Sequence, residues 1–171
     1  MQAEFLSWLV GCSDQLDVDI EYLLRRNHPA LAWFVEIYQD LGPISAVRLR
    51  RLLEQARGRS ARQALEIMKR EVEFYQRTWI HAEIEEGPSG WIEGGNGYFF
   101  LGVEVESWTI EYALLEIGDT VQSEIIDRDW QVWPICEIHG IGLHLKEIDG
   151  QVVWWCNPGM HFVRKVYSRL D

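Results

Sequence analysis

The sequence predicts an α+β protein in which a helical first part is followed by an antiparallel β part. Up to about residue 76, apolar residues recur at the three- and four-residue spacing of amphipathic helices. From residue 77 on, short runs rich in Val, Ile, Trp, Tyr and Phe are separated by Gly, Asp and Asn, which is typical of strands joined by turns. We therefore predict a helical subdomain over residues 1–76 and an antiparallel β meander over residues 77–171, packed as one compact unit.

Four or five helices account for the first part of the chain. Leu16, Ile20 and Leu24 lie on one face of a predicted helix. The segment Pro29–Tyr38 begins with a proline, which is favoured in the first turn of a helix, and it is apolar nearly all round, as a buried helix is. A further apolar stripe over residues 49–56 predicts a third helix.

An arginine-rich stretch spans the end of this third helix and the start of the next. Gly58 is expected to end the third helix, and Ser60 with Gln63 has the spacing of a capping box that opens another. Two basic helices joined by a short turn are compatible with a DNA-binding helix-turn-helix. However, Glu66 faces Arg70 one turn later, which favours a solvated surface or docking onto the acidic half of the chain. The basic residues are Arg48, Arg50, Arg51, Arg57, Arg59, Arg62, Lys69 and Arg70.

The second part of the chain contains eight candidate strands. The strongest turn signal between them is Asp149-Gly150, because both positions of a two-residue hairpin turn need a positive φ that Asp and Gly tolerate. Such a turn pairs Ile148 with Gln151. The candidate strands are Trp79–Ile84, Tyr98–Val105, Trp108–Ile117, Val121–Ile126, Trp130–Val132, Ile141–Ile148, Gln151–Cys156 and Phe162–Tyr167.

Composition is that of a globular protein in a reducing compartment. The 171 residues are 47% hydrophobic and 25% charged, and they contain no apolar stretch of the ~20 residues that a membrane span needs. The three cysteines are an odd number, and no basic leader precedes an apolar stretch at the N-terminus. We therefore expect a cytoplasmic protein without a disulfide framework, a signal peptide or a membrane partner.

The net charge of −11 is concentrated in one segment. Residues 78–127 contain 11 of the 27 acidic residues and no Lys or Arg, so the rest of the chain carries 16 acids and 16 bases. This local excess of negative charge repels phosphates and attracts basic surfaces, which favours a basic protein partner over nucleic acid. Most of the nine tryptophans are expected to fill the core, while Trp91 between Gly-rich turns is expected to be exposed. The predicted partner-binding residues are Trp91, Glu85, Glu86, Glu93, Glu104 and Glu106.

One constellation near the C-terminus has the residue types of a metal site. Cys136 and His139 form one close pair, Cys156 and His161 form another, and the spacing is C-x2-H-x16-C-x4-H. Two short chelating segments are how a structural zinc site is built, and the predicted hairpin brings both pairs to its open end. A second interpretation stays open, in which these residues pack in the core without metal. Neither pair has the more specific C-x2-C spacing, and His144 is a competing ligand.

The tail of the chain carries a recognisable series of short motifs. These are Trp133-Pro134-Ile-Cys136-Glu-Ile-His139-Gly, then Asp149-Gly150, then Trp154-Trp155-Cys156. Over about residues 130–163 the tail resembles small uncharacterised bacterial proteins, in some of which this region looks like a decayed zinc ribbon. This sequence lacks the proline that follows each cysteine in that pattern. The family has no assigned activity, so the resemblance implies a context for the fold and no function.

Known catalytic motifs are missing from the sequence. It contains no G-x-S-x-G elbow, no G-x-x-x-x-G-K phosphate loop and no H-E-x-x-H helix. Cys12 has acidic neighbours at Asp14 and Asp17, which oppose formation of a thiolate. We predict a non-enzymatic acidic protein that engages a basic protein partner, as inhibitors and immunity proteins do. The alternative is a zinc-stapled accessory or regulatory domain that contacts nucleic acid through the Arg-rich helices. The sequence favours a protein without a cofactor, and zinc is the one cofactor that it leaves open.

Overall fold

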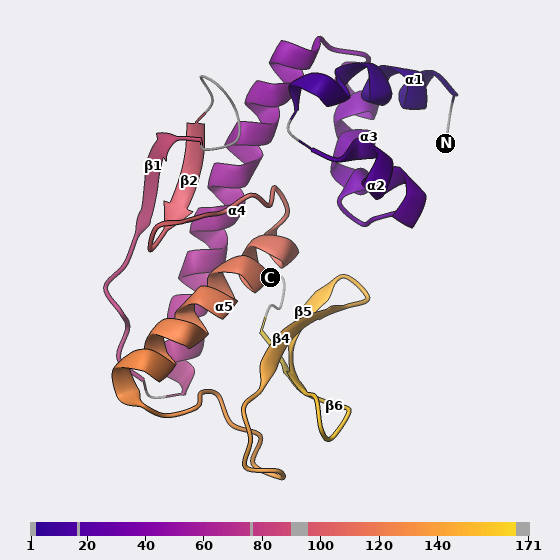
Figure 1. Ribbon diagram of the computed structural model, residues 1–171. Coiled ribbons are helices and arrows are strands. Elements are labelled where there is room, and N and C mark those ends of the chain that lie inside the picture. The colour runs from indigo at the N-terminus through magenta and orange to yellow at the C-terminus, as the bar shows by residue number, and fades with distance from the viewer. Residues whose placement is uncertain (1–2, 17, 76, 90–95, 167–171) are drawn as a thin grey trace.

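The computed structural model describes residues 3–16, 18–75, 77–89 and 96–166 (Figure 1). Its strands form two three-stranded antiparallel sheets that follow the N-terminal helices, so the predicted α+β class is confirmed. None of the described helices combines the length and the apolar character that crossing a bilayer requires. The elements are α1 (Ala3–Cys12), the 3-10 helix η1 (Ser13–Gln15), α2 (Ile20–Arg26), α3 (Leu31–Leu41), α4 (Ala46–Phe74), β1 (Ile84–Pro88), β2 (Asn96–Phe100), β3 (Val103–Glu104), α5 (Ile110–Asp129), β4 (His144–Ile148), β5 (Gln151–Cys156) and β6 (His161–Lys165).

The first three helices and the N-terminal half of α4 enclose one apolar cluster. Leu9 and Phe34 are among the side chains that are fully buried in it. The short helix α2 has a defined start and end. Asp19 accepts a hydrogen bond from the backbone N–H of Tyr22 (2.7 Å), and Asn27 ends the helix in a left-handed conformation. The helical character predicted for this part of the chain is confirmed.

Helix α4 is continuous over 29 residues, so the predicted break at Gly58 is wrong. The glycine is needed because the ring of Tyr98 on β2 packs directly against it. A Cβ at Gly58 would lie 2.6 Å from Tyr98 Cε1 and 2.8 Å from its hydroxyl oxygen. Ser60 caps no helix, and its hydroxyl donates to the backbone carbonyl of Trp108 (2.9 Å). The arginine-rich stretch is therefore part of one continuous helix and does not form a helix-turn-helix.

Helix α5 occupies the region in which Trp108–Ile117 and Val121–Ile126 were expected to be strands, and both strand predictions are wrong. The β-branched residues favoured strands, but tertiary packing overrides that propensity. Gly118 lies inside the helix, and Leu145 of β4 packs into the space that a side chain at this position would occupy. The buried residues recur with helical spacing, at Ala113, Leu114, Ile117, Gly118, Val121, Gln122 and Ile125.

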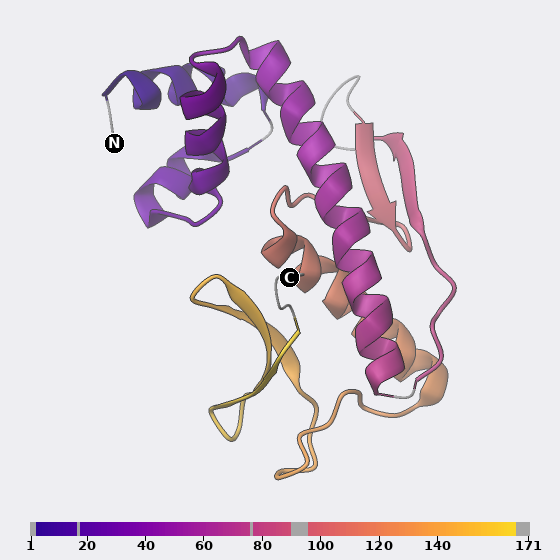
Figure 2. The ribbon, with the colours of Figure 1, turned by 180° about the vertical axis from the view of Figure 1, so that it is seen from behind.

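Helices α4 and α5 pack against each other in the middle of the molecule, and each carries a sheet on its other side (Figures 1 and 2). β1 and β2 contact α4, while β4 and β5 contact α5. The main apolar core lies between these layers, and Met68, Ile117 and Trp154 are fully buried in it. α4 is thus shared by both apolar clusters, which makes it the scaffold of the whole fold.

The second sheet contains the hairpin that the sequence predicts. Ile148 lies opposite Gln151, and the turn residues Asp149 and Gly150 have φ values of 51° and 75°. β6 then continues antiparallel to β5. Other strand predictions are shifted or wrong, because residues 79–83 and 130–132 form no strand and β1 begins only at Ile84.

A buried ionic contact joins the C-terminal half of α4 to the second sheet. Glu71 accepts a hydrogen bond from the indole N–H of Trp154 (2.8 Å) and pairs with Arg164 of β6. Arg164 also donates to the hydroxyl of Tyr75 (3.3 Å). Burial raises the pKa of Glu71, while the hydrogen bonds from Trp154 and Arg164 and the positive charge of Arg164 act in the opposite direction.

Candidate metal centre and surface sites

The first predicted ligand pair lies in the tight loop that precedes β4. The backbone N–H of Gly140 donates to the carbonyl of Cys136, and the N–H of Cys136 donates to the carbonyl of Ile141, both at 2.8 Å. Gly140 has a φ of 65°, a conformation that glycine adopts without strain, so the chain reverses directly after His139. This reversal brings His139 Nδ1 to 3.4 Å from Cys136 Sγ.

The second ligand pair lies at the end of the β5–β6 hairpin. Cys156 is the last residue of β5, His161 is the first of β6, and the two are opposite each other in the register. Gly159 in the connecting turn faces the first loop. A Cβ at Gly159 would lie 2.9 Å from His139 Nδ1 and 3.2 Å from Cys156 Sγ. A glycine at this position therefore allows His139 to reach the second pair.

The four side chains converge on one point. Their ligand atoms all lie within 4.8 Å of one another. Cys136 Sγ is 3.4 Å from His161 Nε2, and Cys156 Sγ is 3.3 Å from His139 Nδ1. In a tetrahedral zinc site with metal–sulfur distances of ~2.3 Å and metal–nitrogen distances of ~2.0–2.1 Å, sulfur and nitrogen are about 3.5 Å apart. The group thus has the dimensions of a four-ligand site and could hold a metal ion.

The two thiols have different environments. Burial opposes ionisation of Cys136, but hydrogen bonds from His161, from His139 and from the backbone N–H groups of His139 and Ile138 outweigh it. Together they lower the pKa of Cys136 from 9.0 to about 6. Burial and the neighbouring Cys136 raise the pKa of Cys156. A bound cation would stabilise both thiolates, so metal binding at this group would release protons.

His144 and Cys12 do not join the group. His144 is exposed, lies opposite Trp155 in the β4–β5 hairpin and acts electrostatically on Asp119 of α5. Cys12 is buried in the helical cluster, where burial raises the pKa of its thiol. The ligand set predicted from the sequence is therefore the set that the structure brings together.

Three of the predicted partner-binding acids lie on the first sheet. Glu85 of β1 and Glu104 of β3 flank Phe99 of β2 on one face, because both are opposite Phe99 in the register. Glu86 lies on the other face of this sheet, where it pairs with Arg62 of α4. The three carboxylates are thus divided between the two faces, and Glu86 also helps to attach the sheet to the helix.

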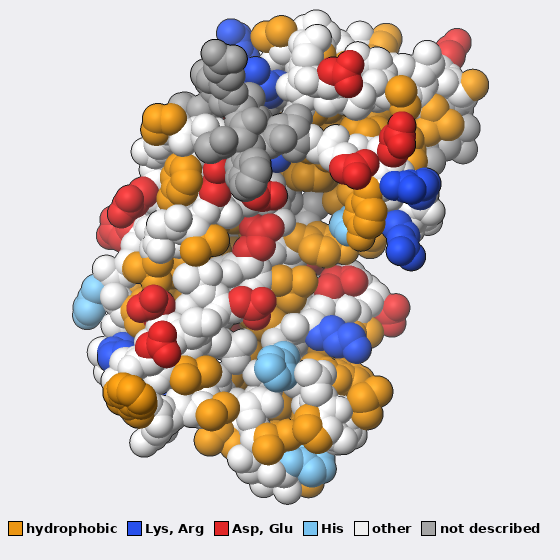
Figure 3. Space-filling model, in the orientation of Figure 1, with side chains coloured by type: hydrophobic (Ala, Val, Ile, Leu, Met, Phe, Trp, Pro, Cys, Tyr) orange, Lys and Arg blue, Asp and Glu red, His pale blue; other side chains and the backbone are white. Residues whose placement is uncertain are grey.

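The other predicted partner-binding residues are Glu106, Trp91 and Glu93. Glu106 is exposed in the loop before α5, and its backbone N–H donates to Glu116 (3.1 Å). Burial raises the pKa of Glu116, against hydrogen bonds from Ser107. Trp91 and Glu93 lie outside the described residues. Figure 3 shows acidic side chains over the surface formed by the first sheet and α5.

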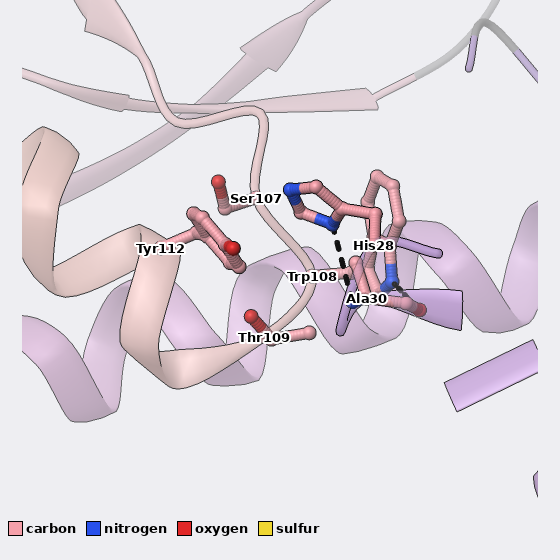
Figure 4. Close-up of a pocket in the computed structure, with 6 residues that line it drawn as sticks. All are labelled: His28, Ala30, Ser107, Trp108, Thr109 and Tyr112. Atoms are coloured by element: carbon pink, nitrogen blue, oxygen red, sulfur yellow. Dashed lines mark hydrogen bonds between the residues drawn. The ribbon is translucent and has the colours of Figure 1, made fainter. Parts of the chain in front are cut away.

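A small recess that the sequence does not indicate lies between the helical part and the start of α5 (Figure 4). The rings of His28 and Tyr112 lie 4.8 Å apart in it. The indole N–H of Trp108 donates to the carbonyl of Ala30 (3.4 Å). Thr109 Oγ1 is buried and has no hydrogen-bond partner among the described residues. Only the tertiary fold brings these residues together, so no spacing in the sequence could have predicted the recess.

No protein-family model, curated protein or solved structure matches this chain. Its function is therefore inferred from the arrangement of its own residues.

Proposed function

We propose that this chain is a zinc-stabilised, non-enzymatic binding protein that engages a basic protein partner. The observation that carries the proposal is the convergence of Cys136, His139, Cys156 and His161 at the distances of a tetrahedral site. Two thiols and two imidazoles are ligands that suit Zn²⁺. Because the protein supplies all four ligands, no position is left for a reacting water, and the ion acts as a structural one.

The position of the group explains what a structural ion does here. It joins the loop before β4 to the turn between β5 and β6, two segments that are about 20 residues apart in the sequence. Binding energy at such a site is folding energy, since the site does not exist in the unfolded chain. The ion would therefore fasten the second sheet, which in turn packs against α5.

The acidic surface supports the second half of the proposal. Glu85 and Glu104 flank an aromatic ring, Phe99, on one face of the first sheet. Carboxylates beside an aromatic ring suit the Lys and Arg side chains of a basic partner. Nucleic acid is a poorer candidate, because α4 forms no helix-turn-helix and its Arg62 is already paired with Glu86.

The zinc part is tested by elemental analysis of the purified protein. We expect about one zinc per chain, as a closed four-ligand site binds one ion. His139→Ala and Cys156→Ser should lose it. The matched controls His144→Ala and Cys12→Ser remove the same residue types outside the group and should retain it. Wild-type protein with far less than one zinc per chain, or metal loss in the controls alone, would contradict the proposal.

The partner part is tested by capture on the immobilised protein at low salt. We expect basic proteins to be retained, and Glu85→Lys/Glu104→Lys to lose them because the charge of the sheet face is reversed. Glu21→Lys/Glu73→Lys makes the same charge change on exposed helical positions and should retain them. Retention of the wild type on heparin, with no capture of basic proteins, would favour the nucleic-acid alternative instead.

A further inference from the structure

A wider cavity lies beside the recess of Figure 4 and opens to the surface. Its volume is about 380 Å³, which is within the range of ~300–1,000 Å³ typical of small-molecule sites. Trp108, Thr109 and Tyr112 line both the recess and the cavity. The other walls come from α3 and from the β4–β5 hairpin, so three segments that are distant in the sequence form it.

Aromatic rings and carboxylates share the lining of this cavity. Three of the lining residues are aromatic and three are acidic, and none of the described residues that line it is Lys or Arg. On α3 one ring and one carboxylate are three residues apart, which places them on the same side of the helix. The residues concerned are Trp33, Trp108 and Tyr112, and Glu36, Glu111 and Glu147.

The carboxylates impose a negative field on the rings. Burial raises the pKa of Tyr112, and the negative charges of Glu147 and Glu111 are further causes of the increase. The N-terminus of α5 carries a partial positive charge, which the three carboxylates outweigh. Thr109 Oγ1, which is buried without a partner among the described residues, is an acceptor that an N–H donor could satisfy.

We propose that this cavity binds the cationic side chain of a lysine or arginine from a basic protein partner. Aromatic faces attract an ammonium or guanidinium group, and nearby carboxylates act on it more strongly in a partly dehydrated cavity than in water. The N–H groups of either side chain can donate to Thr109 Oγ1. The assignment rests on the proposed function for the source of the side chain, but it uses a surface separate from Glu85 and Glu104.

The experiment follows the indole N–H signals of Trp33 and Trp108 by NMR in the metal-loaded, full-length protein. The probes are N-acetyl-lysine N-methylamide, N-acetyl-arginine N-methylamide and the neutral isostere N-acetyl-norleucine N-methylamide, all at constant ionic strength. We expect at least one cationic probe to shift both signals, and norleucine to leave them in place. The assignment would be overturned if the norleucine probe shifted the signals as much as the cationic probes do. It would also be overturned if neither cationic probe shifted them.

Matched variants distinguish the effect of the cavity on probe binding from the effect of the net charge of the protein. Glu111→Gln/Glu147→Gln should weaken binding of the cationic probe at least tenfold, because two of the three carboxylates are neutralised. Glu73→Gln/Glu124→Gln makes the same charge change at exposed sites outside the cavity and should alter binding less than twofold. An equal loss in both pairs would mean that only net charge matters, and the assignment would be wrong.

A tryptophan pair provides a second readout. Trp33→Leu removes one wall of the cavity and should weaken probe binding at least tenfold. Trp130→Leu removes a side chain that is 91% exposed and outside the cavity, and should leave binding unchanged. Capture of a basic protein that survives every cavity variant, but is lost in Glu85→Lys/Glu104→Lys, would overturn the cavity assignment alone. Binding of the probes without capture of any protein would contradict only the proposed function.

Discussion

At the scale of single residues, two glycines inside helices mark places where a strand approaches the helix closely. Gly58 of α4 is covered by the ring of Tyr98, and Gly118 of α5 is covered by Leu145. Glycine is normally unfavourable in the middle of a helix by roughly 0.5–1 kcal/mol relative to alanine. Here the absence of a side chain lets each sheet pack against its helix, which offsets that cost.

Replacing Gly118 by alanine is therefore expected to destabilise the protein. The new Cβ overlaps Leu145, and overpacking of this kind costs ~1–3 kcal/mol, more than the gain in helix propensity. Gly11→Ala in α1 is the matched control, since nothing lies within 4 Å of its Cβ position, and it should stabilise the protein by up to about 1 kcal/mol. Denaturant unfolding measures both, and equal effects in the two variants would refute the packing explanation.

Glu71→Gln tests the buried ionic contact through its pH dependence. Because burial raises the pKa of Glu71, the folded state holds this proton more tightly than the unfolded chain does. The resulting stabilisation is fully present below the ordinary pKa of 4.5 and is lost as the pH rises through the folded-state pKa. The unfolding free energy of the wild type, relative to the Gln variant, should thus fall from acidic to neutral pH. A relative stability that increases with pH would show that pairing with Arg164 outweighs burial.

At the scale of elements, the second sheet is held by two local features of its own, a tight turn and the Cys/His group. Its hairpin is specified by Asp149 and Gly150, both at positive φ, and its far end is closed by the Cys/His group. The helices α1–α3 have their own apolar cluster and contribute no ligand to that group. The two parts of the chain should therefore respond differently to the loss of a metal ion.

Removal of the metal by a chelator is expected to loosen β4–β6 selectively. Amide hydrogen exchange should become faster in these strands, because the binding energy of a structural ion stabilises the segments that it joins. Amides of α1–α3 serve as the internal control and should keep their protection. Uniform acceleration throughout the protein would indicate global unfolding, and no change in any strand would argue against a structural ion.

At the scale of the whole molecule, the charge is unevenly distributed along a chain of net charge −11. Among the described acids of residues 78–127, Glu83 directly precedes β1, and the others lie on the first sheet, on the loop after it and on α5. The Arg-rich helix α4 packs against the first sheet and against α5, and ion pairs such as Arg62 with Glu86 neutralise part of the negative charge. The remaining negative surface is the part that would attract a basic partner over a distance.

Association with a basic partner should therefore weaken steeply as salt is added. The screening length falls from about 30 Å at 0.01 M to about 10 Å at 0.1 M ionic strength, so the long-range attraction is largely lost over that range. Measuring the association rate at several salt concentrations tests this, since steering acts mainly on that rate. Glu85→Lys/Glu104→Lys should show a flatter salt dependence than the wild type. A rate that does not vary with salt would contradict an electrostatic role for this surface.

Short-range features of the sequence by themselves determined the α+β class, the β4–β5 turn and the candidate metal-ligand set. Turn conformation depends on Asp149 and Gly150, and ligand chemistry depends on residue type, so both can be read without knowing the fold. Only the tertiary structure decided that α4 runs through Gly58 and that residues 110–129 are helical. In the fold, Tyr98 packs against Gly58 and Leu145 packs against Gly118, so these glycines are sites of close packing and do not end a helix. The tertiary structure alone also brought α3, α5 and the hairpin together into one cavity, since no local interaction links segments so distant in the chain.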